Sequence, residues 1–265
     1  MTKILLAKPS AGTDAVAKGV QYITKDGIPQ TVNARREVII PGGAINSPRL
    51  LELSGIGGAK LLQSLGVEVV VDNPHVGENL QNHVFTGVTF EVNDDVETID
   101  AFFRQEPEAV AAAMQEYATK GTGPMGTCNT ITTAHLPLPE LHTDEGCQNL
   151  QELLSTLGSK DDAQRSSLTT PAFAAAHEDF VRSVLTDPRQ PLGHYVMGPA
   201  YVPFDASPAY RAPGKWISIA IEIAHPLSRG AVHITSATPE HAGSNDGVIV
   251  DPRYLSHQCE SPSLS

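Results

Sequence analysis

The chain has 265 residues, of which 40% are hydrophobic and 18% charged, an ordinary composition for a globular protein. Its formal net charge of −12 argues against a partner that carries many phosphates, either a nucleic acid or an anionic membrane. No stretch approaches the roughly 20 apolar residues of a membrane span. The apolar run near the N-terminus is too short for a signal peptide, so the sequence as written predicts a cytoplasmic protein.

The first part of the chain is expected to be rich in β-strands. Short runs of apolar and β-branched residues at 3–6, 19–24 and 31–32 favour three strands. Asp26-Gly27, between the last two runs, favours a hairpin turn because glycine tolerates positive φ. The apolar run at 37–40 is typical of a buried strand.

An α/β unit is expected next. Ser47 is a good N-cap, and Pro48 suits the first helical position because its missing N–H would have no partner there. Gly55 would end this helix. A second helix is predicted at 59–65 and a strand at 67–71.

The pattern changes at about residue 84, where an antiparallel sheet covered by helices is expected. Strict alternation of apolar and polar residues predicts a strand at 216–223, and 232–234 is predicted to be its neighbour in the sheet. Further elements are predicted in the same half, namely a strand at 86–92 and helices at 99–117 and 171–185.

The most specific segment runs from Gly43 to Gly57 and combines a glycine-rich turn with a capped helix. Such a turn lets the backbone approach a ligand closely and points free N–H groups at polar or anionic atoms. This segment resembles the second signature of the glucose-methanol-choline (GMC) oxidoreductases. Three further segments resemble motifs of that family in the expected order, namely Val76–His83, His225–Val232 and Asp251–Leu255.

The resemblance implies FAD as cofactor and the oxidation of a small-molecule alcohol by hydride transfer to the flavin. It implies an α/β plus α+β fold, with a partial, Rossmann-like FAD-binding domain at 1–84 and an antiparallel-sheet substrate domain with helices at 85–235. A return segment and irregular tail would follow at 236–265. The implied cofactor-binding residues are Gly42, Gly43, Ala44, Asn46, Ser47, Asn79 and His83.

Two parts of the family pattern are missing from the sequence, the N-terminal GxGxxG and the C-terminal catalytic histidine. The GxGxxG at Gly121–Gly126 follows a predicted helix and contains Pro124, so it is interpreted as a glycine-rich loop. His257 belongs to the tail of the last motif, so no catalytic residue is assigned. The chain is therefore expected to be a fragment, truncated at both ends, that neither binds FAD tightly nor oxidises alcohols alone. The longer relative could be secreted.

Two alternatives stay open. The chain could be a non-enzymatic remnant that acts as an interaction module, or one half of a split enzyme completed by a separately encoded N-terminal half. No metal site is predicted, because the three cysteines and the histidines lack the spacing of metal ligands. An aromatic cluster in the second half could favour an aromatic substrate, but ordinary core packing explains it equally well; its members are Tyr195, Tyr201, Phe204, Tyr210 and Trp216.

Overall fold

The computed structural model divides the chain into two compact units. The first contains residues 1–82, 157–177 and 227–265, and the second contains residues 83–156 and 178–226. The residues that the structure describes are 2–7, 14–127, 132–137, 142–155, 157, 171–204, 213–237, 247–257 and 259–260.

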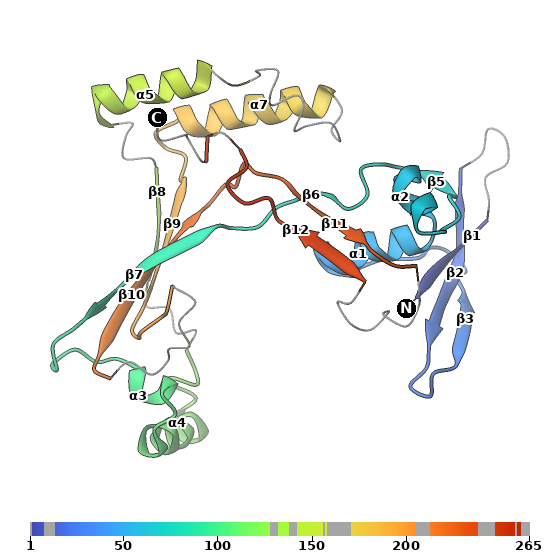
Figure 1. Ribbon diagram of the computed structural model, residues 1–265. Coiled ribbons are helices and arrows are strands. Elements are labelled where there is room, and N and C mark those ends of the chain that lie inside the picture. The colour runs from blue at the N-terminus through green and yellow to red at the C-terminus, as the bar shows by residue number, and fades with distance from the viewer. Residues whose placement is uncertain are drawn as a thin grey trace. The chain divides into compact units, whose positions relative to one another are not determined.

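The first unit opens with a three-stranded antiparallel meander in the order β1-β2-β3 (Figure 1). Its strands are β1 (Lys3–Ala7), β2 (Val16–Ile23) and β3 (Pro29–Asn33). The predicted strands near these positions and the hairpin turn between β2 and β3 are confirmed.

The predicted strand at 37–40 is wrong. This segment is not part of any sheet among the described residues, and the side chain of Ile39 is 70% exposed. An apolar run forms a strand only where a neighbouring backbone pairs with it. The described part of the chain supplies no such neighbour here.

The next elements are α1 (Gly43–Leu53) and α2 (Ala59–Ser64), with the short parallel pair β4 (Ile56–Gly57) and β5 (Val71–Asp72) beside them. This confirms the two predicted helices, whereas the strand predicted at 67–71 is wrong apart from its last residue, because β5 begins at Val71.

The start of α1 differs from the prediction. The helix begins at Gly43, so Ser47 is not its N-cap and Pro48 lies inside it. The Ser47 hydroxyl instead accepts a hydrogen bond from the Gly42 N–H (3.0 Å) and donates one to the Ile40 carbonyl (3.3 Å). Ser47 therefore fixes the chain that leads into the helix. Pro48 is the sixth residue of α1, so the helix lacks the hydrogen bond that an N–H at this position would donate to the Ala44 carbonyl.

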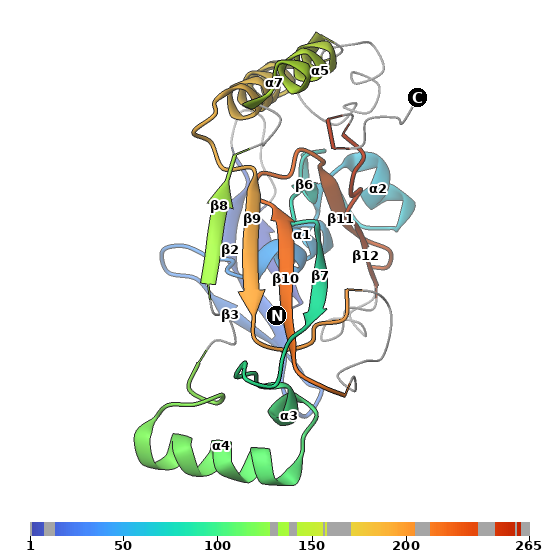
Figure 2. The same ribbon diagram turned by 90° about the vertical axis from the view of Figure 1, so that its left-hand side faces the viewer.

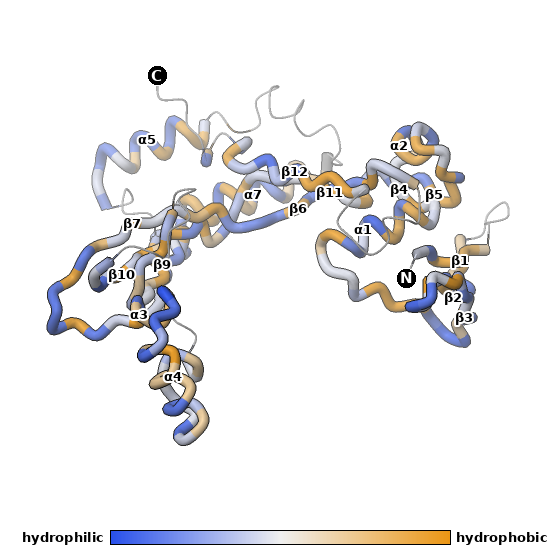
Figure 3. Tube along the Cα trace, turned by 60° about the horizontal axis from the view of Figure 1, so that its bottom comes forward, coloured by the Kyte–Doolittle hydropathy of each residue, from blue (hydrophilic) through white to orange (hydrophobic). Residues whose placement is uncertain are grey.

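A second sheet of the first unit joins segments far apart in the sequence. The central strand is β11 (Gly230–Ile234), which pairs antiparallel with β6 (Glu78–Leu80) on one side and β12 (Val248–Asp251) on the other. Helix α1 packs against β11, whose apolar character is visible in Figure 3. Buried side chains of this unit include Ile4, Leu50, Leu62, Val76, Leu227, Ala231, Val232 and Ile234.

The second unit is built on one antiparallel sheet in the order β7-β10-β9-β8 (Figure 2). Its strands are β7 (Phe85–Glu91), β8 (Thr132–Leu136), β9 (Gly193–Gly198) and β10 (Trp216–Ile223). The strands predicted at 86–92 and 216–223 are confirmed. The predicted pairing of 216–223 with 232–234 is wrong, because β7 and β9 occupy both edges of β10.

Four helices are described in this part of the chain, namely α3 (Asp100–Phe103), α4 (Pro107–Lys120), α5 (Asp144–Ser155) and α7 (Pro171–Thr186). The predicted helix at 99–117 is interrupted, because Pro107 starts a new helix. Gly121 ends α4 in the left-handed conformation, which confirms that the GxGxxG of 121–126 follows a helix.

A buried polar residue organises the second unit. The side chain of Asp100 accepts hydrogen bonds from the N–H groups of Tyr201 (2.7 Å) and Trp216 (2.8 Å), and the residue is 3% exposed. It thereby joins α3 to the start of β10 and to the segment after β9.

The predicted mixed fold with antiparallel sheets is confirmed. The units change at 82/83, 156/157, 177/178 and 226/227, while the domain boundaries expected after residues 84 and 235 remain predictions. Residues 227–234 fall in the first unit because β11 pairs with β6 and β12.

Candidate functional site

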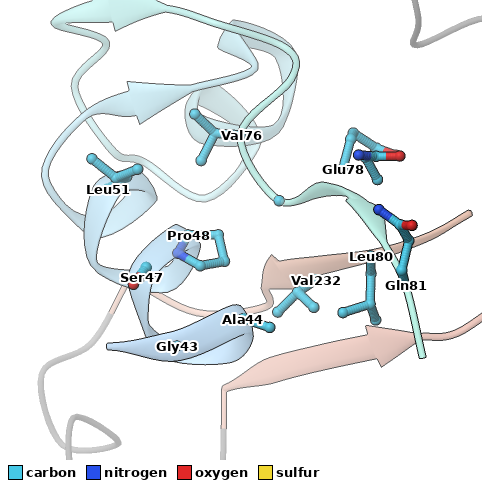
Figure 4. A pocket seen from close by; sticks show the side chains of 12 residues that line it. Gly43, Ala44, Ser47, Pro48, Leu51, Val76, Glu78, Leu80, Gln81 and Val232 are labelled. Carbon is cyan, nitrogen blue, oxygen red and sulfur yellow. The ribbon is translucent and has the colours of Figure 1, made fainter. Parts of the chain in front are cut away.

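A pocket of about 480 Å³ lies in the first unit, within the size range of small-molecule sites. Figure 4 shows its two walls, one formed by the first turns of α1 and the other by β6 and the residues before it. Val232 of β11 closes it. The lining residues are Gly43, Ala44, Ser47, Pro48, Leu51, Val76, Gly77, Glu78, Asn79, Leu80, Gln81 and Val232.

The α1 wall is open at its glycine. Gly43 has φ +73°, and a Cβ at this position would meet no atom within 4 Å. The space beside the backbone is therefore free for a ligand. The first N–H groups of any α-helix lack partners within the helix, so this wall can offer donors as well as space.

The opposite wall is fixed to β11. Gly77 has φ +83°, and a Cβ there would lie 2.1 Å from the Val232 carbonyl oxygen. The Val232 N–H donates a hydrogen bond to the Gly77 carbonyl at 2.7 Å. Only glycine allows this close approach. Asn79, two residues further on, is also left-handed, with φ 63°.

A charged cluster joins the two walls behind the pocket. The Nδ1 of His233 lies 2.7 Å from Oε1 of Glu52 on α1, and its Nε2 lies 2.9 Å from Oε1 of Glu78 on β6. The Glu52 side chain is fully buried and also accepts a hydrogen bond from the Ile234 N–H at 2.8 Å. Arg253 lies 3.5 Å from the second oxygen of Glu78.

These contacts determine the charge of His233. Hydrogen bonds to Glu52 and then Glu78 raise the pKa of His233 from 6.5 to about 9, although partial burial lowers it. An ionised carboxylate only accepts hydrogen bonds, so both ring nitrogens must carry protons in this geometry. His233 is therefore a cation at neutral pH.

The structure brings together four of the seven predicted cofactor-binding residues, Gly43, Ala44, Ser47 and Asn79. Gly42 precedes the pocket, and Asn46 lies exposed on α1 without lining it. His83 belongs to the second unit, where its Nδ1 lies 2.7 Å from the Ile223 carbonyl oxygen. The cofactor roles of all seven remain predictions.

Sequence reasoning missed the charged cluster. Its one local signal is Glu52, a carboxylate among the leucines at positions 50, 51 and 53 of an amphipathic helix. The sequence separation of 181 residues between Glu52 and His233 hides their pairing. Tyr210 of the predicted aromatic cluster lies outside the described residues, and Tyr201 and Trp216 contact edge to face at 5.3 Å.

The described residues contain neither a metal-ligand cluster nor a helix that could span a membrane. Across these ranges no three side chains of His, Cys, Asp or Glu are grouped as metal ligands would be. In the same part of the chain, every helix is too short or too polar to span a lipid bilayer.

Solved structures share this fold. The fold matches an FAD-dependent oxidoreductase from Chaetomium thermophilum with a TM-score of 0.71 and 23% identity, over 98% of this chain and 40% of that one. It matches a fungal aryl-alcohol oxidase with a TM-score of 0.66 and 20% identity, over 98% and 41% of the two chains. These likenesses define the fold.

The sequence comparisons define the family. The sequence model described as GMC oxidoreductase matches residues 1–85. A dehydrogenase, citC, of Monascus ruber is 29% identical over 99% of this chain and 42% of its own length. An alcohol oxidase of Pichia angusta is 32% identical over 87% of this chain and 31% of its own length. Residues 1–85 thus match the GMC oxidoreductase family, and the chain spans about two fifths of the length of the first of these relatives.

Proposed function

We propose that this chain is part of an FAD-dependent oxidoreductase that acts on the CH–OH group of an alcohol. In this proposal the pocket of the first unit takes part of the FAD, and the sheet of the second unit belongs to the substrate domain. The observation that carries the proposal is that two segments with family motifs, at 43–57 and 76–83, supply the two walls of one pocket.

The pocket residues fit a dinucleotide in three respects. The open side of Gly43 leaves room for a ligand against the backbone. The start of α1 can offer N–H donors to polar or anionic atoms. The apolar side chains of Leu51, Val76 and Val232 offer a surface for a flat ring or a sugar. A mostly apolar lining with a few polar groups is the usual character of small-molecule sites.

The other predicted contacts form part of the same proposal. Gly42 and Ser47 hold the entry to α1 through their hydrogen bond, and Asn46 and Asn79 offer polar side chains near the two walls. His83 would contact the cofactor from the start of the second unit. Bound FAD would supply the acceptor for the hydride that leaves the alcohol carbon. From the family resemblance, an alcohol substrate is also proposed, together with an N-terminal half that is either missing or separately encoded.

The proposal is tested by titrating the isotopically labelled chain with FAD and following its backbone amide NMR signals. This measurement detects weak binding, which suits a chain that covers part of its relatives' length. We expect shifts in the amides of residues 42–47 and 76–81. The Gly43→Ala variant adds a methyl group to the pocket wall and should lose most of these shifts.

The matched control is Gly66→Ala. Gly66 has φ +72° and no atom within 4 Å of an added Cβ, so its backbone strain equals that of Gly43, but it does not line the pocket. This variant should keep the shifts. No shifts in the wild-type chain, or shifts confined to residues outside the pocket, would contradict the cofactor assignment.

The reaction is tested separately by adding a primary alcohol to the chain and FAD without oxygen. Bleaching of the yellow flavin that free FAD does not show would support alcohol oxidation. Amide shifts without bleaching are the result expected for this chain, to which no catalytic residue is assigned, and they would support the cofactor assignment alone.

A further inference from the structure

We propose that His233 is a positioning residue that clasps the two walls of the pocket, holding α1 through Glu52 and β6 through Glu78. The ligand named in the test rests on the proposed function, but the clasp itself does not. His233 does not line the pocket, so it would act through the residues it holds.

The imidazole of His233 lies between two carboxylates. Each ring nitrogen faces a carboxylate oxygen, at 2.7 Å toward Glu52 and 2.9 Å toward Glu78. These are the lengths of charge-assisted hydrogen bonds. The two carboxylates come from different pocket walls, so one ring ties both walls to β11.

The side chain of Glu52, on α1, is fully buried. A buried carboxylate is costly unless a cation and hydrogen bonds compensate it. His233 supplies the charge and the Ile234 N–H supplies a further donor at 2.8 Å. Removal of the imidazole would leave the carboxylate of α1 without its cation, with the hydrogen bond from the Ile234 N–H still linking it to β11.

The β6 wall contains Asn79 in the left-handed conformation, with φ 63°, which asparagine adopts more readily than most residues with a side chain. Glu78 precedes it and is fixed on one side by His233 and on the other by Arg253, which also pairs with Asp251 at 2.9 Å. The charged groups around His233 are thus Glu52, Glu78, Arg253 and Asp251.

The test is hydrogen exchange of the whole chain without ligand, expressed as protection factors for residues 76–81. In His233→Gln, which is polar but cannot bridge both carboxylates as a cation, protection at 76–81 should fall at least about tenfold, the equivalent of one charge-assisted hydrogen bond. Protection in β7, β8, β9 and β10 should stay unchanged. The control is His75→Gln, an exposed histidine beside the same wall, which should leave all protection unchanged.

Exchange measured at several pH values shows whether the charge of His233 holds the two walls or whether its side chain only fills space. In the wild-type chain, protection at 76–81 should fall as the pH rises through about 9, where the imidazole loses its charge. The His233→Gln variant should lack this step and His75→Gln should keep it. Equal protection in a folded His233→Gln variant, or a wild-type chain without the step, would overturn the proposal.

If His233→Gln does not fold, Glu78→Gln decides the matter. It breaks the clasp on the β6 side only, so protection should fall at 76–81 and persist in α1, where the Glu52–His233 pair remains. Loss of protection in both segments alike, or in neither, would overturn the proposal.

FAD titration of His233→Gln should show about tenfold weaker amide shifts at equal ligand. If wild-type chain shows no FAD shifts, the proposed cofactor fails while the exchange data still decide the clasp.

Discussion

At the scale of single residues, His233 has a strongly raised pKa. Its two carboxylate partners belong to elements that approach only in the folded state, so the unfolded chain keeps the ordinary pKa of 6.5. The folded pKa of about 9 means that the native state holds the proton more tightly. The difference corresponds to about 3 kcal/mol of stability at a pH below both values.

The stabilisation that His233 provides depends on pH. Because the folded pKa of His233 is raised, its stabilisation is complete below about pH 6.5 and is lost as the pH rises through about 9. We expect the free energy of unfolding of the first unit to fall between these values, and to fall much less in His233→Gln. Hydrogen exchange of the α1 amides in increasing urea measures this free energy of unfolding at each pH. A free energy that does not change with pH in the wild-type chain would contradict the raised pKa of His233.

Asp100 gives a second prediction at this scale. The Asp100→Ala substitution leaves the N–H groups of Tyr201 and Trp216 without their acceptor, which should cost about 2 to 4 kcal/mol. Trp216, the one tryptophan of the sequence, reports unfolding of its own strand by fluorescence in urea. The exposed Asp95 provides the control, because Asp95→Ala should change stability by less than about 0.5 kcal/mol.

Single residues also show what the sequence could reveal of the site. The signature at 43–57 and the motif at 76–83 pointed to Gly43, Ala44, Ser47 and Asn79, which share one pocket. Glu52 lies within the first motif, yet its importance depends on His233, and no local pattern predicts that pairing. Burial of a carboxylate is visible only once the fold has brought its cation to it.

At the scale of elements, the predictions that succeeded depended on local patterns. The alternation at 216–223 depends only on a sheet with one buried face, so β10 was predicted correctly. The strand at 37–40 and the pairing of 232–234 needed knowledge of distant neighbours, and both predictions failed. The start of α1 was misplaced because Ser47 and Pro48 form a typical helix start, while the actual one, at Gly43, has no strong capping residue.

The β6 wall gives a prediction for an element. In Gly77→Ala the new methyl group would collide with the Val232 carbonyl and the residue would remain left-handed, so we expect a loss of about 3 kcal/mol. Gly66→Ala has the same backbone conformation and open space, so it should cost only about 1 kcal/mol. Thermal unfolding measures the stability lost in each variant. Equal losses of stability would show that the close approach of Gly77 to Val232 does not make the first variant less stable than the second.

At the scale of the whole molecule, the first unit depends on the end of the chain and the second does not. All four strands of the β7-β10-β9-β8 sheet precede residue 227, whereas β11 and β12 follow it. A chain ended after Pro226 should therefore lose exchange protection in α1, where Glu52 has no partner, and keep it in β10. Hydrogen exchange followed by mass spectrometry gives both values in one experiment, and intact protection of α1 would contradict this dependence.

The separation of 181 residues between Glu52 and His233 also sets an order of events during synthesis. Ribosomes add about 5 to 20 residues per second, so α1 leaves the exit tunnel roughly ten to thirty seconds before the histidine that neutralises it. During that interval Glu52 lacks its cation and α1 lacks its packing against β11, although α1 can already contact β1 and β4. The first half of the nascent chain therefore exposes surface that chaperones can bind until β11 and β12 have been synthesised.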